Sequence, residues 1–150
     1  MRSPLLKRKT KLLLYKTLIR PVLTYAAETW KLTQVDEEAL AVFERRVLRS
    51  ILGGIFENKA WRQRRNTKLY RSFKEPDIVK FIKIQRIKRI GHAIRMEDRA
   101  TKNIVLAKPT GSRPRGRPKI RFLDCLEKDF NTIRIKNWRT TAKNREPGTD

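Results

Sequence analysis

The sequence has only one cysteine, Cys125, and one histidine, His92, among its 150 residues. A structural zinc site needs about four Cys or His ligands, so these two residues cannot form one by themselves. A single cysteine also forms no disulfide within the chain, which fits a reducing compartment. A disulfide-stapled scaffold and a self-contained zinc module are therefore excluded.

Acidic residues are scarce as well, and no two aspartates are adjacent anywhere in the sequence. Phosphoryl transfer by two metal ions needs carboxylates that converge on the metals. The acids cluster only at Asp36–Glu38 and Glu97–Asp98, and the first cluster fits the start of a helix, where acids complement the helix dipole. A Gly-rich phosphate loop followed by Lys and Ser or Thr is also missing. We therefore expect no catalytic residue and no cofactor in this chain.

Long apolar runs are missing too, since none approaches the roughly 20 residues that span a bilayer. Cations at Lys7, Arg8, Lys9 and Lys11 interrupt the first apolar residues, unlike a signal peptide. No acidic residue precedes Glu28, and mitochondrial presequences are likewise poor in acidic residues. The apolar spacing of this segment, however, suits a core helix. We expect neither a membrane nor a small-molecule substrate as a partner.

Basic residues are abundant: 38 Lys and Arg against 15 Asp and Glu give a formal net charge of +23. Self-repulsion of this size weakens a compact fold unless a polyanion relieves it. Phosphate backbones are the commonest such polyanion, and cations that neutralise them release counterions. The charge therefore predicts RNA or DNA as the partner.

The spacing of apolar residues predicts a mainly α fold, an irregular bundle of about five or six helices. A first helix is predicted to run to about Arg20, where Pro21 ends or kinks it. Its apolar face consists of Leu12, Tyr15, Leu18 and Ile19. Lys9, Lys16 and Arg20 fall on the opposite face.

A second helix is expected to begin after Thr33, which can cap it, and to stop at Gly53-Gly54. Its predicted apolar stripe consists of Val35, Ala39, Val42, Phe43, Val47 and Ile51. A loop and a short helix at Asn66–Phe73 follow, and Pro76-Asp77 opens a long, largely buried helix. We expect the Lys and Arg side chains of that helix to extend outward to water.

The composition changes at a basic loop punctuated by Pro and Gly, Thr110–Lys119, which precedes the last helices. Those helices turn Phe122, Leu123, Leu126, Phe130, Ile133, Trp138 and Ala142 inward. The chain thus falls into three segments: a helical region at 1–54, a helical middle region at 55–107, and the loop with the C-terminal helices at 108–150.

Trp61 stands among cations at Arg62, Arg64 and Arg65. Bases can stack on an exposed indole while arginines hold the phosphates. The same residues also fit a core tryptophan with a solvated basic rim. The sequence leaves both interpretations open for Trp61, whereas Trp30 and Trp138 fit core positions better.

The loop contains Arg115-Gly116-Arg117 between two prolines, a pattern that looks like the AT-hook. Narrow A·T-rich minor grooves attract inserted arginine, and glycine permits a close approach of the backbone. A helix that begins directly after Lys119 would restrict the loop, which favours simple phosphate contact. The candidate contacts are Arg113, Arg115, Arg117 and Lys119.

An ordered set of motifs resembles the region just past the polymerase palm in reverse transcriptases of LINE-type (non-LTR) retrotransposons. The first motif is YKTLIRPVLTY at Tyr15–Tyr25, followed by Glu28-Thr29-Trp30. The later landmarks are Phe43–Arg49, Glu57-Asn58 with Trp61-Arg62, Gly91-His92 with Arg95-Met96, Arg115–Lys119, and Trp138 with Ala142. Ile90 and Phe122 depart from the pattern, since an aromatic residue is common at the first place and a tryptophan at the second.

The resemblance implies a part of an RNA-directed DNA polymerase that uses Mg²⁺ and copies element RNA at a nicked target. Residues 1–54 would be thumb-like, and the chain would grip template–primer, element RNA or target DNA. The family's metal-binding aspartates lie upstream of this region, so the resemblance implies no polymerase activity of the chain alone. It also implies the missing palm as a partner and a nuclear location with cytoplasmic passage.

The leading hypothesis is therefore a nucleic-acid-binding part of a reverse transcriptase that contacts phosphates without sequence specificity. The alternative is an independent AT-hook-like module that binds the DNA minor groove or chromatin. The candidate contacts are Lys9, Lys16, Arg20, Arg62, Arg64, Arg65, Arg113, Arg115, Arg117 and Lys119, with Trp61 as a stacking platform.

Overall fold

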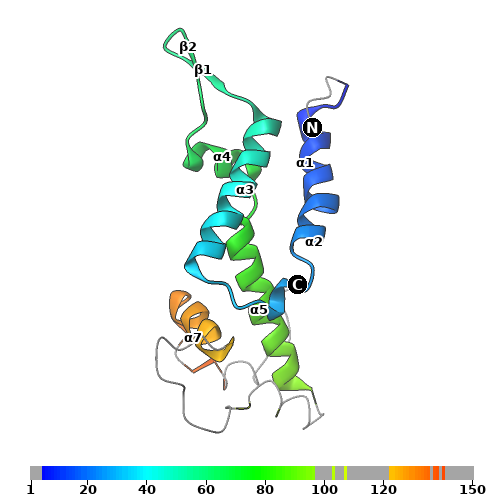
Figure 1. Ribbon diagram of the computed structural model, residues 1–150, viewed down its shortest axis with the longest axis vertical. Coiled ribbons are helices and arrows are strands. Elements are labelled where there is room, and N and C mark those ends of the chain that lie inside the picture. Colours follow the sequence, from blue (N-terminus) through cyan, green and yellow to red (C-terminus); the bar gives the residue numbers. More distant parts are fainter. Residues whose placement is uncertain are drawn as a thin grey trace. The chain divides into compact units, whose positions relative to one another are not determined.

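The computed structural model describes residues 5–96, 103, 107, 122–135, 137, 138 and 140. These residues are mainly helical, and they also form one antiparallel sheet of two strands (Figure 1). The predicted fold class is therefore confirmed. In the part of the chain that is described, no helix combines the length and the apolar character needed to cross a membrane.

The chain divides into two compact units. The first unit consists of Met1–Ala26 with Leu32–Ile82, and the second consists of Ala27–Lys31 with Lys83–Asp150. Helix α5, Ile78–Arg95, contributes residues to both. The three segments predicted from the sequence, 1–54, 55–107 and 108–150, are bounded by changes in composition. The two units are defined by packing, and their boundaries lie at other positions.

The first helical stretch changes its winding before Pro21. Helix α1 covers Arg8–Leu14, the π-helix η1 covers Tyr15–Ile19, and α2 covers Arg20–Leu23. Proline lacks an N–H, and its ring clashes with the carbonyl four residues earlier in a regular α-helix. In η1 the N–H of Arg20 instead donates to the carbonyl of Tyr15, five residues back. The wider turn accommodates Pro21, so the helix continues past the end that the sequence predicts near Arg20.

Helix α3, Gln34–Leu52, has both of the ends that the sequence predicts. Asp36 N–H donates to Thr33 Oγ1 at 3.3 Å, and Thr33 N–H donates to Asp36 Oδ2 at 2.9 Å. This capping box satisfies donors that an open helix end leaves unpaired. Gly53, at φ +70°, ends the helix with a conformation that favours glycine.

The buried face of α3 differs from the predicted stripe. Its buried residues are Glu44, Leu48, Ile51 and Leu52. Val35, Val42 and Phe43, which belong to the predicted stripe, are 74%, 47% and 41% exposed. The stripe is therefore wrong over most of its length, because a carboxylate occupies the centre of the buried face and apolar spacing alone cannot reveal it.

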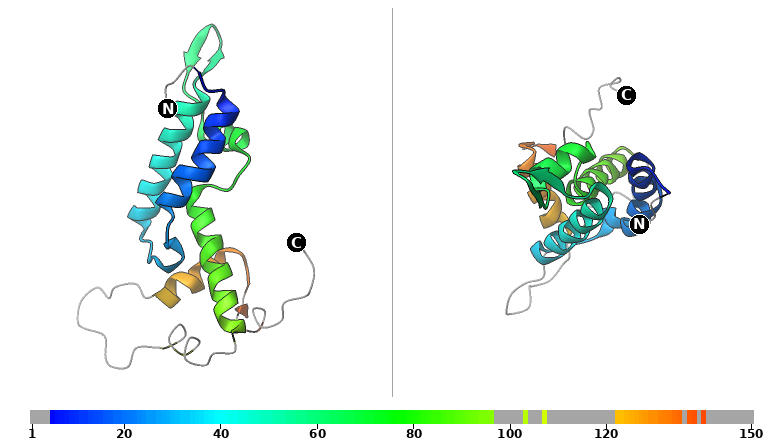
Figure 2. Two further views of the ribbon diagram at one scale, coloured as in Figure 1. Left: turned by 90° about the vertical axis from the view of Figure 1, so that its right-hand side faces the viewer. Right: turned by 90° about the horizontal axis from the view of Figure 1, so that it is seen from above.

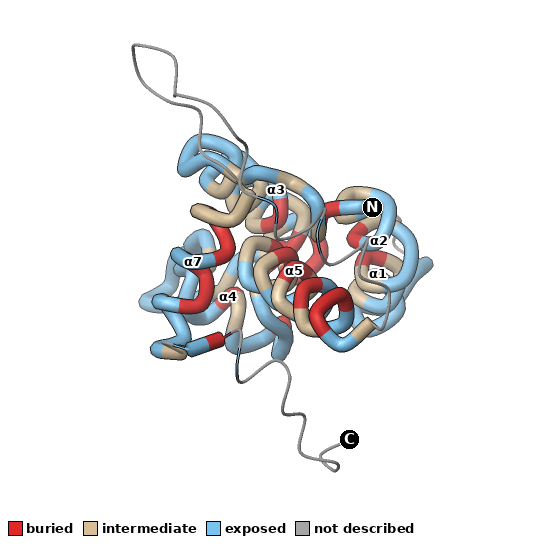
Figure 3. Tube along the Cα trace, turned by 90° about the horizontal axis from the view of Figure 1, so that it is seen from below, coloured by how far each residue is buried: buried red, intermediate tan, exposed pale blue. Residues whose placement is uncertain are grey.

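The core of the first unit gathers residues of η1, α3 and α4, Asn66–Phe73. It consists of Tyr15, Leu48, Ile51, Leu52, Leu69 and Phe73. Helix α1 lies beside α3 (Figure 2). Buried residues alternate with exposed ones along α3, whereas the residues of α1 are exposed or half-buried (Figure 3). The bounds of α4 agree with the prediction.

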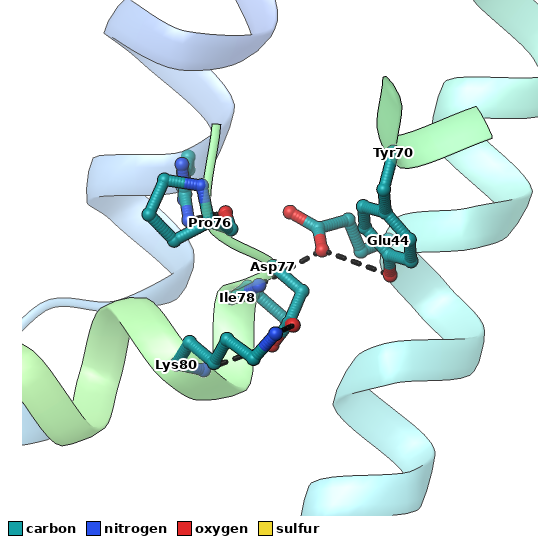
Figure 4. Close-up of polar contacts among 7 residues, drawn as sticks. Glu44, Tyr70, Pro76, Asp77, Ile78 and Lys80 are labelled. Carbon is teal, nitrogen blue, oxygen red and sulfur yellow. Dashed lines mark hydrogen bonds and ion pairs between the residues drawn. The ribbon is translucent and has the colours of Figure 1, made fainter. Parts of the chain in front are cut away.

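Glu44 links four elements of this unit, although its side chain is fully buried. Its carboxylate accepts a hydrogen bond from the hydroxyl of Tyr15 at 2.9 Å. It also accepts from the hydroxyl of Tyr70 at 3.2 Å and the N–H of Ile78 at 2.8 Å (Figure 4). Ile78 is the first residue of α5, where the helix dipole also favours a negative charge. Glu44 of α3 thus joins η1, α4 and the start of α5.

The Glu44 contacts predict how stability depends on alkaline pH. Burial, with the Glu44 carboxylate nearby, raises the pKa of Tyr70 to about 12 and also raises the pKa of Tyr15. Tyrosine in an unfolded chain ionises near pH 10. The unfolded state therefore releases protons that the folded state retains, so this stabilisation is complete below pH 10 and declines as pH rises toward 12.

We expect the free energy of unfolding, measured by urea titration, to fall between pH 10 and 12. Tyr70→Phe should make that decline shallower, because it removes one of the tyrosines with a raised pKa. If the wild-type chain and Tyr70→Phe lost stability equally with pH, ionisation of Tyr70 would be ruled out as a cause.

The second unit has a separate core between α5 and α7, Phe122–Thr132. It consists of Ile90, Ile94, Leu126, Phe130 and Trp138. The rings of Phe130 and Trp138 stack at 4.8 Å with an angle of 4° between their planes. Trp138, Leu126 and Phe130 thus point inward as predicted, whereas Ile133 is 49% exposed.

Arg86 is an exception to the expectation that the cations of α5 extend to water. Its side chain is 2% exposed, and Nη1 donates to Asp129 Oδ2 of α7 at 2.8 Å. A guanidinium can be buried when a carboxylate compensates its charge. The expectation fails here because the compensating acid lies 43 residues away in the sequence.

Candidate nucleic-acid interface

A β-hairpin follows α3 directly, where the sequence predicts only a loop. Strand β1, Ile55–Glu57, pairs with β2, Ala60–Arg62 (Figure 1). The turn residues Asn58 and Lys59 have φ angles of 52° and 57°. Positive φ at both central residues is typical of a type I′ turn, which usually takes glycine at its second position. The prediction misses this hairpin because the strands are short and a lysine replaces that glycine.

Gly54 allows the hairpin to lie close to the end of α3. A Cβ atom at this position would lie 3.0 Å from the carbonyl oxygen of Arg62 and 3.4 Å from Cε3 of Trp61. The first separation is too short for an ordinary contact, and a backbone atom yields little. The absence of a side chain at Gly54 therefore leaves room for strand β2 to lie close to the end of α3.

An exposed aromatic pair occupies the hairpin. Phe56 and Trp61 are direct partners in the strand register. Their ring centroids are 5.5 Å apart with an angle of 56° between the planes, and they are 61% and 76% exposed. Trp61 is thus a surface residue, so the interpretation as a core tryptophan is wrong.

An open hollow of about 440 Å³ borders the Trp61 indole. The last turn of α3 and the residues around the hairpin form its walls, with Arg49, Gly53, Gly54, Trp61 and Arg62 among the lining residues. The hollow therefore joins an aromatic wall to two arginines.

The arginines around the hollow differ in their contacts. Arg49 Nη2 donates to Asn66 Oδ1 at 2.6 Å, and Arg64 Nε donates to the carbonyl of Gly53 at 3.1 Å. These two half-buried side chains brace the framework of the site. Arg62 and Arg65 are exposed, so they are better placed to contact a phosphate.

Glu57 is the only acidic residue between Ile55 and Arg65. Lys68 Nζ donates to its carboxylate, and this hydrogen bond lowers the pKa of Glu57. The negative charge of the hairpin is thus compensated by Lys68, and the charges of Lys59, Arg62 and Arg65 determine the local potential.

The other candidates on the first helical stretch fall into different environments. Lys9 is exposed on α1, as a phosphate contact requires. Lys16 Nζ lies 2.9 Å from Glu75 Oε1 and 5.3 Å from the centre of the Phe73 ring. A phosphate would have to compete with Glu75 for Lys16.

Arg20 does not lie on the outer face that the sequence predicts. It is 4% exposed, and Nη2 donates to the carbonyl of Pro76 at 2.7 Å. Its guanidinium carbon lies 4.2 Å from the centre of the Phe81 ring. The i to i+5 winding of η1 turns Arg20 toward the side of Tyr15, which a regular helix does not do. Arg20 is a packing residue in this structure, so its prediction as a surface contact is wrong.

The candidate contacts of the basic loop, Arg113, Arg115, Arg117 and Lys119, lie outside the described residues. His92 is exposed in the last turn of α5, and Cys125 is buried on α7. Burial raises the pKa of the Cys125 thiol, so this residue has the character of an inert thiol. Over the ranges that the structure describes, no group of three or more His, Cys, Asp and Glu side chains could hold a metal ion.

Phe56 and Arg49 contribute to the site although neither residue is among the contacts predicted from the sequence. Phe56 and Trp61 stand at mirror positions about Asn58-Lys59, and that symmetry is the signal that could have identified the pair. Arg49 carries no comparable signal, because only the packing of the α3 end against Asn66 brings it to the hollow.

No protein-family model, curated protein or solved structure matches the chain.

Proposed function

We propose that the chain binds nucleic acid through the phosphates and without sequence specificity. The net charge of +23 carries this proposal. Exposed cations such as Lys9, Arg62 and Arg65 give the charge access to an external polyanion. Cations on such a surface attract phosphate backbones of any sequence, because the contact involves no base edge.

The contacts of the acidic residues support the same proposal. Glu75 pairs with Lys16, Glu57 with Lys68 and Asp77 with Lys80. Glu44 is buried among hydrogen-bond donors, and Asp129 is buried beside Arg86. These acids are engaged within the chain, so they do little to offset the remaining basic surplus, and an external anion can do so.

The resemblance to LINE-type reverse transcriptases supports a more specific proposal. The chain would be the thumb and following basic segment of such an enzyme and would grip template–primer, element RNA or target DNA. A separate palm would hold the Mg²⁺ ions and perform the polymerisation, and the complex would act in the nucleus. The ordered set of sequence landmarks is the support for this proposal.

Charge-neutral variants test the phosphate contacts. We expect Arg65→Gln to weaken duplex binding equally on A·T-rich and G·C-rich DNA, and to reduce the slope of log affinity against log salt by about 1. Fluorescence anisotropy at several salt concentrations measures both quantities.

Lys80→Gln is the matched control, since it removes the same charge from an exposed lysine that already pairs with Asp77. Its slope should equal that of the wild-type chain. Identical behaviour of the two variants would argue against a local phosphate contact at Arg65, and a selective loss on A·T-rich DNA would favour minor-groove recognition.

A further inference from the structure

The aromatic pair on the hairpin has the character of a binding surface. Phe56 and Trp61 expose 61% and 76% of their surface, although aromatic side chains gain free energy when they leave water. In the other aromatic pairs of the described residues, Tyr15 with Phe73 and Phe130 with Trp138, both side chains are buried. The exposed rings of this pair therefore form a surface that a flat, apolar group of a ligand could cover.

The surroundings of the pair indicate which kind of group this is. Arg62 lies next to Trp61 in β2 and also lines the hollow, and Arg65 follows within the same segment. A nucleotide combines a flat base, which can stack on the rings, with an anionic phosphate, which can contact the arginines. Bases inside a duplex stack on one another, so only an unpaired base offers its π-face to an indole.

We propose that the hairpin is a binding site for single-stranded nucleic acid. An unpaired base stacks on the Trp61 indole in the hollow, and the adjoining phosphates contact Arg62 and Arg65. This inference rests on the proposed function and deepens it, because it names unpaired strands as the substrate class of this surface.

The geometry of the hollow fits this occupant. Its volume of about 440 Å³ falls within the roughly 300 to 1,000 Å³ of typical small-molecule sites. Phe56 packs against the indole across the hairpin, with ring centroids 5.5 Å apart, and the absence of a side chain at Gly54 leaves room beside the ring. An indole held in this way loses little conformational freedom when a base stacks on it, which favours binding.

The experiment compares three ligands: a single strand, a duplex of half its length, and an abasic strand of the same length as the single strand. All three then carry equal numbers of phosphates. We expect Trp61→Ala to lower single-strand affinity roughly 5- to 150-fold, the equivalent of one stacked base. Duplex affinity should stay unchanged. The wild-type chain and the variant should bind the abasic strand equally, because it carries phosphates without bases.

Three further variants separate stacking from other effects. Trp61→Phe keeps a ring and should retain most of the single-strand affinity, whereas Trp61→Leu keeps only apolar surface and should lose it. Tyr25→Ala is the matched control, because Tyr25 is 82% exposed on the same unit; it should bind like the wild-type chain. Circular dichroism shows whether each variant keeps its helices, and Trp61→Phe and Trp61→Leu decide the question if Trp61→Ala does not fold.

The outcomes distinguish this inference from the proposed function. Equal losses of single-strand and duplex affinity in Trp61→Ala, or no loss in either, would overturn the single-strand site while the phosphate proposal stands. Salt-independent binding by the wild-type chain would instead contradict the phosphate proposal. Concentration-dependent self-association that Trp61→Ala abolishes, measured by sedimentation, would identify a second copy of the chain as the occupant and overturn the inference.

Discussion

The affinity of the chain for a nucleic-acid duplex is expected to fall by roughly 10³ to 10⁵ between 50 and 200 mM salt if six to ten phosphates are engaged. Each cation that neutralises a phosphate releases a condensed counterion, and added salt opposes that release. The net charge of +23 provides more than enough cations for a contact of this size. Fluorescence anisotropy across a salt series measures the slope.

Salt has a second effect that must be measured in parallel. Screening weakens the repulsion among the cations of the free chain, so added salt should stabilise the fold while it weakens binding. Circular dichroism of the free chain at each salt concentration separates the two effects. A flat binding response from a chain that stays folded would contradict the proposed function.

Replacement of Glu44 by leucine is expected to lower the free energy of unfolding by on the order of 3 to 5 kcal/mol. The carboxylate accepts hydrogen bonds from Tyr15, Tyr70 and the N–H of Ile78. Leucine accepts none, so these donors would lose their partner inside the protein, and unsatisfied buried donors are costly. Urea titration followed by circular dichroism measures the change.

Two other variants test whether the loss of stability in Glu44→Leu comes from its unsatisfied hydrogen-bond donors. Glu38→Gln alters an exposed carboxylate on the same helix and should change stability by less than about 0.5 kcal/mol. Tyr70→Phe in the Glu44→Leu background removes one orphaned hydroxyl and should recover part of the stability. If Glu44→Leu were as mild as Glu38→Gln, the linking role of Glu44 would be refuted.

Features set by neighbouring residues could be predicted from the sequence. Thr33 with Asp36 forms the cap of α3, and Gly53 ends the same helix. Capping boxes and glycine stops act within a single turn, so a short stretch of sequence contains all the information that they need.

Features set by distant partners could not be predicted. Glu44 contacts residues 26 to 34 positions away, and Arg86 contacts Asp129 across 43 positions. Both side chains are charged, and a charged residue usually indicates a solvent-exposed position. The sequence shows the charge but not the distant partner whose hydrogen bonds or opposite charge offset the cost of burial.

The candidate site could be predicted only in part, because its geometry also depends on contacts that the local composition does not reveal. The composition around Trp61 indicates stacking and phosphate contact, but it fits a core position equally well. Only the exposure of Trp61 and its pairing with Phe56 separate these interpretations. The pairing depends on a two-residue turn at Asn58-Lys59, where lysine at positive φ obscures the usual signal.

The π-helix before Pro21 has a consequence for any comparison of this chain with others. A turn closed by an i to i+5 hydrogen bond contains one residue more than the α-turn closed by i to i+4. A homologue with a regular α-helix here would therefore align only with a one-residue gap within Tyr15–Ile19. Without that gap, the residues of α1, Arg8–Leu14, would be matched to the wrong side of the helix, and inward-facing positions would be compared with surface positions.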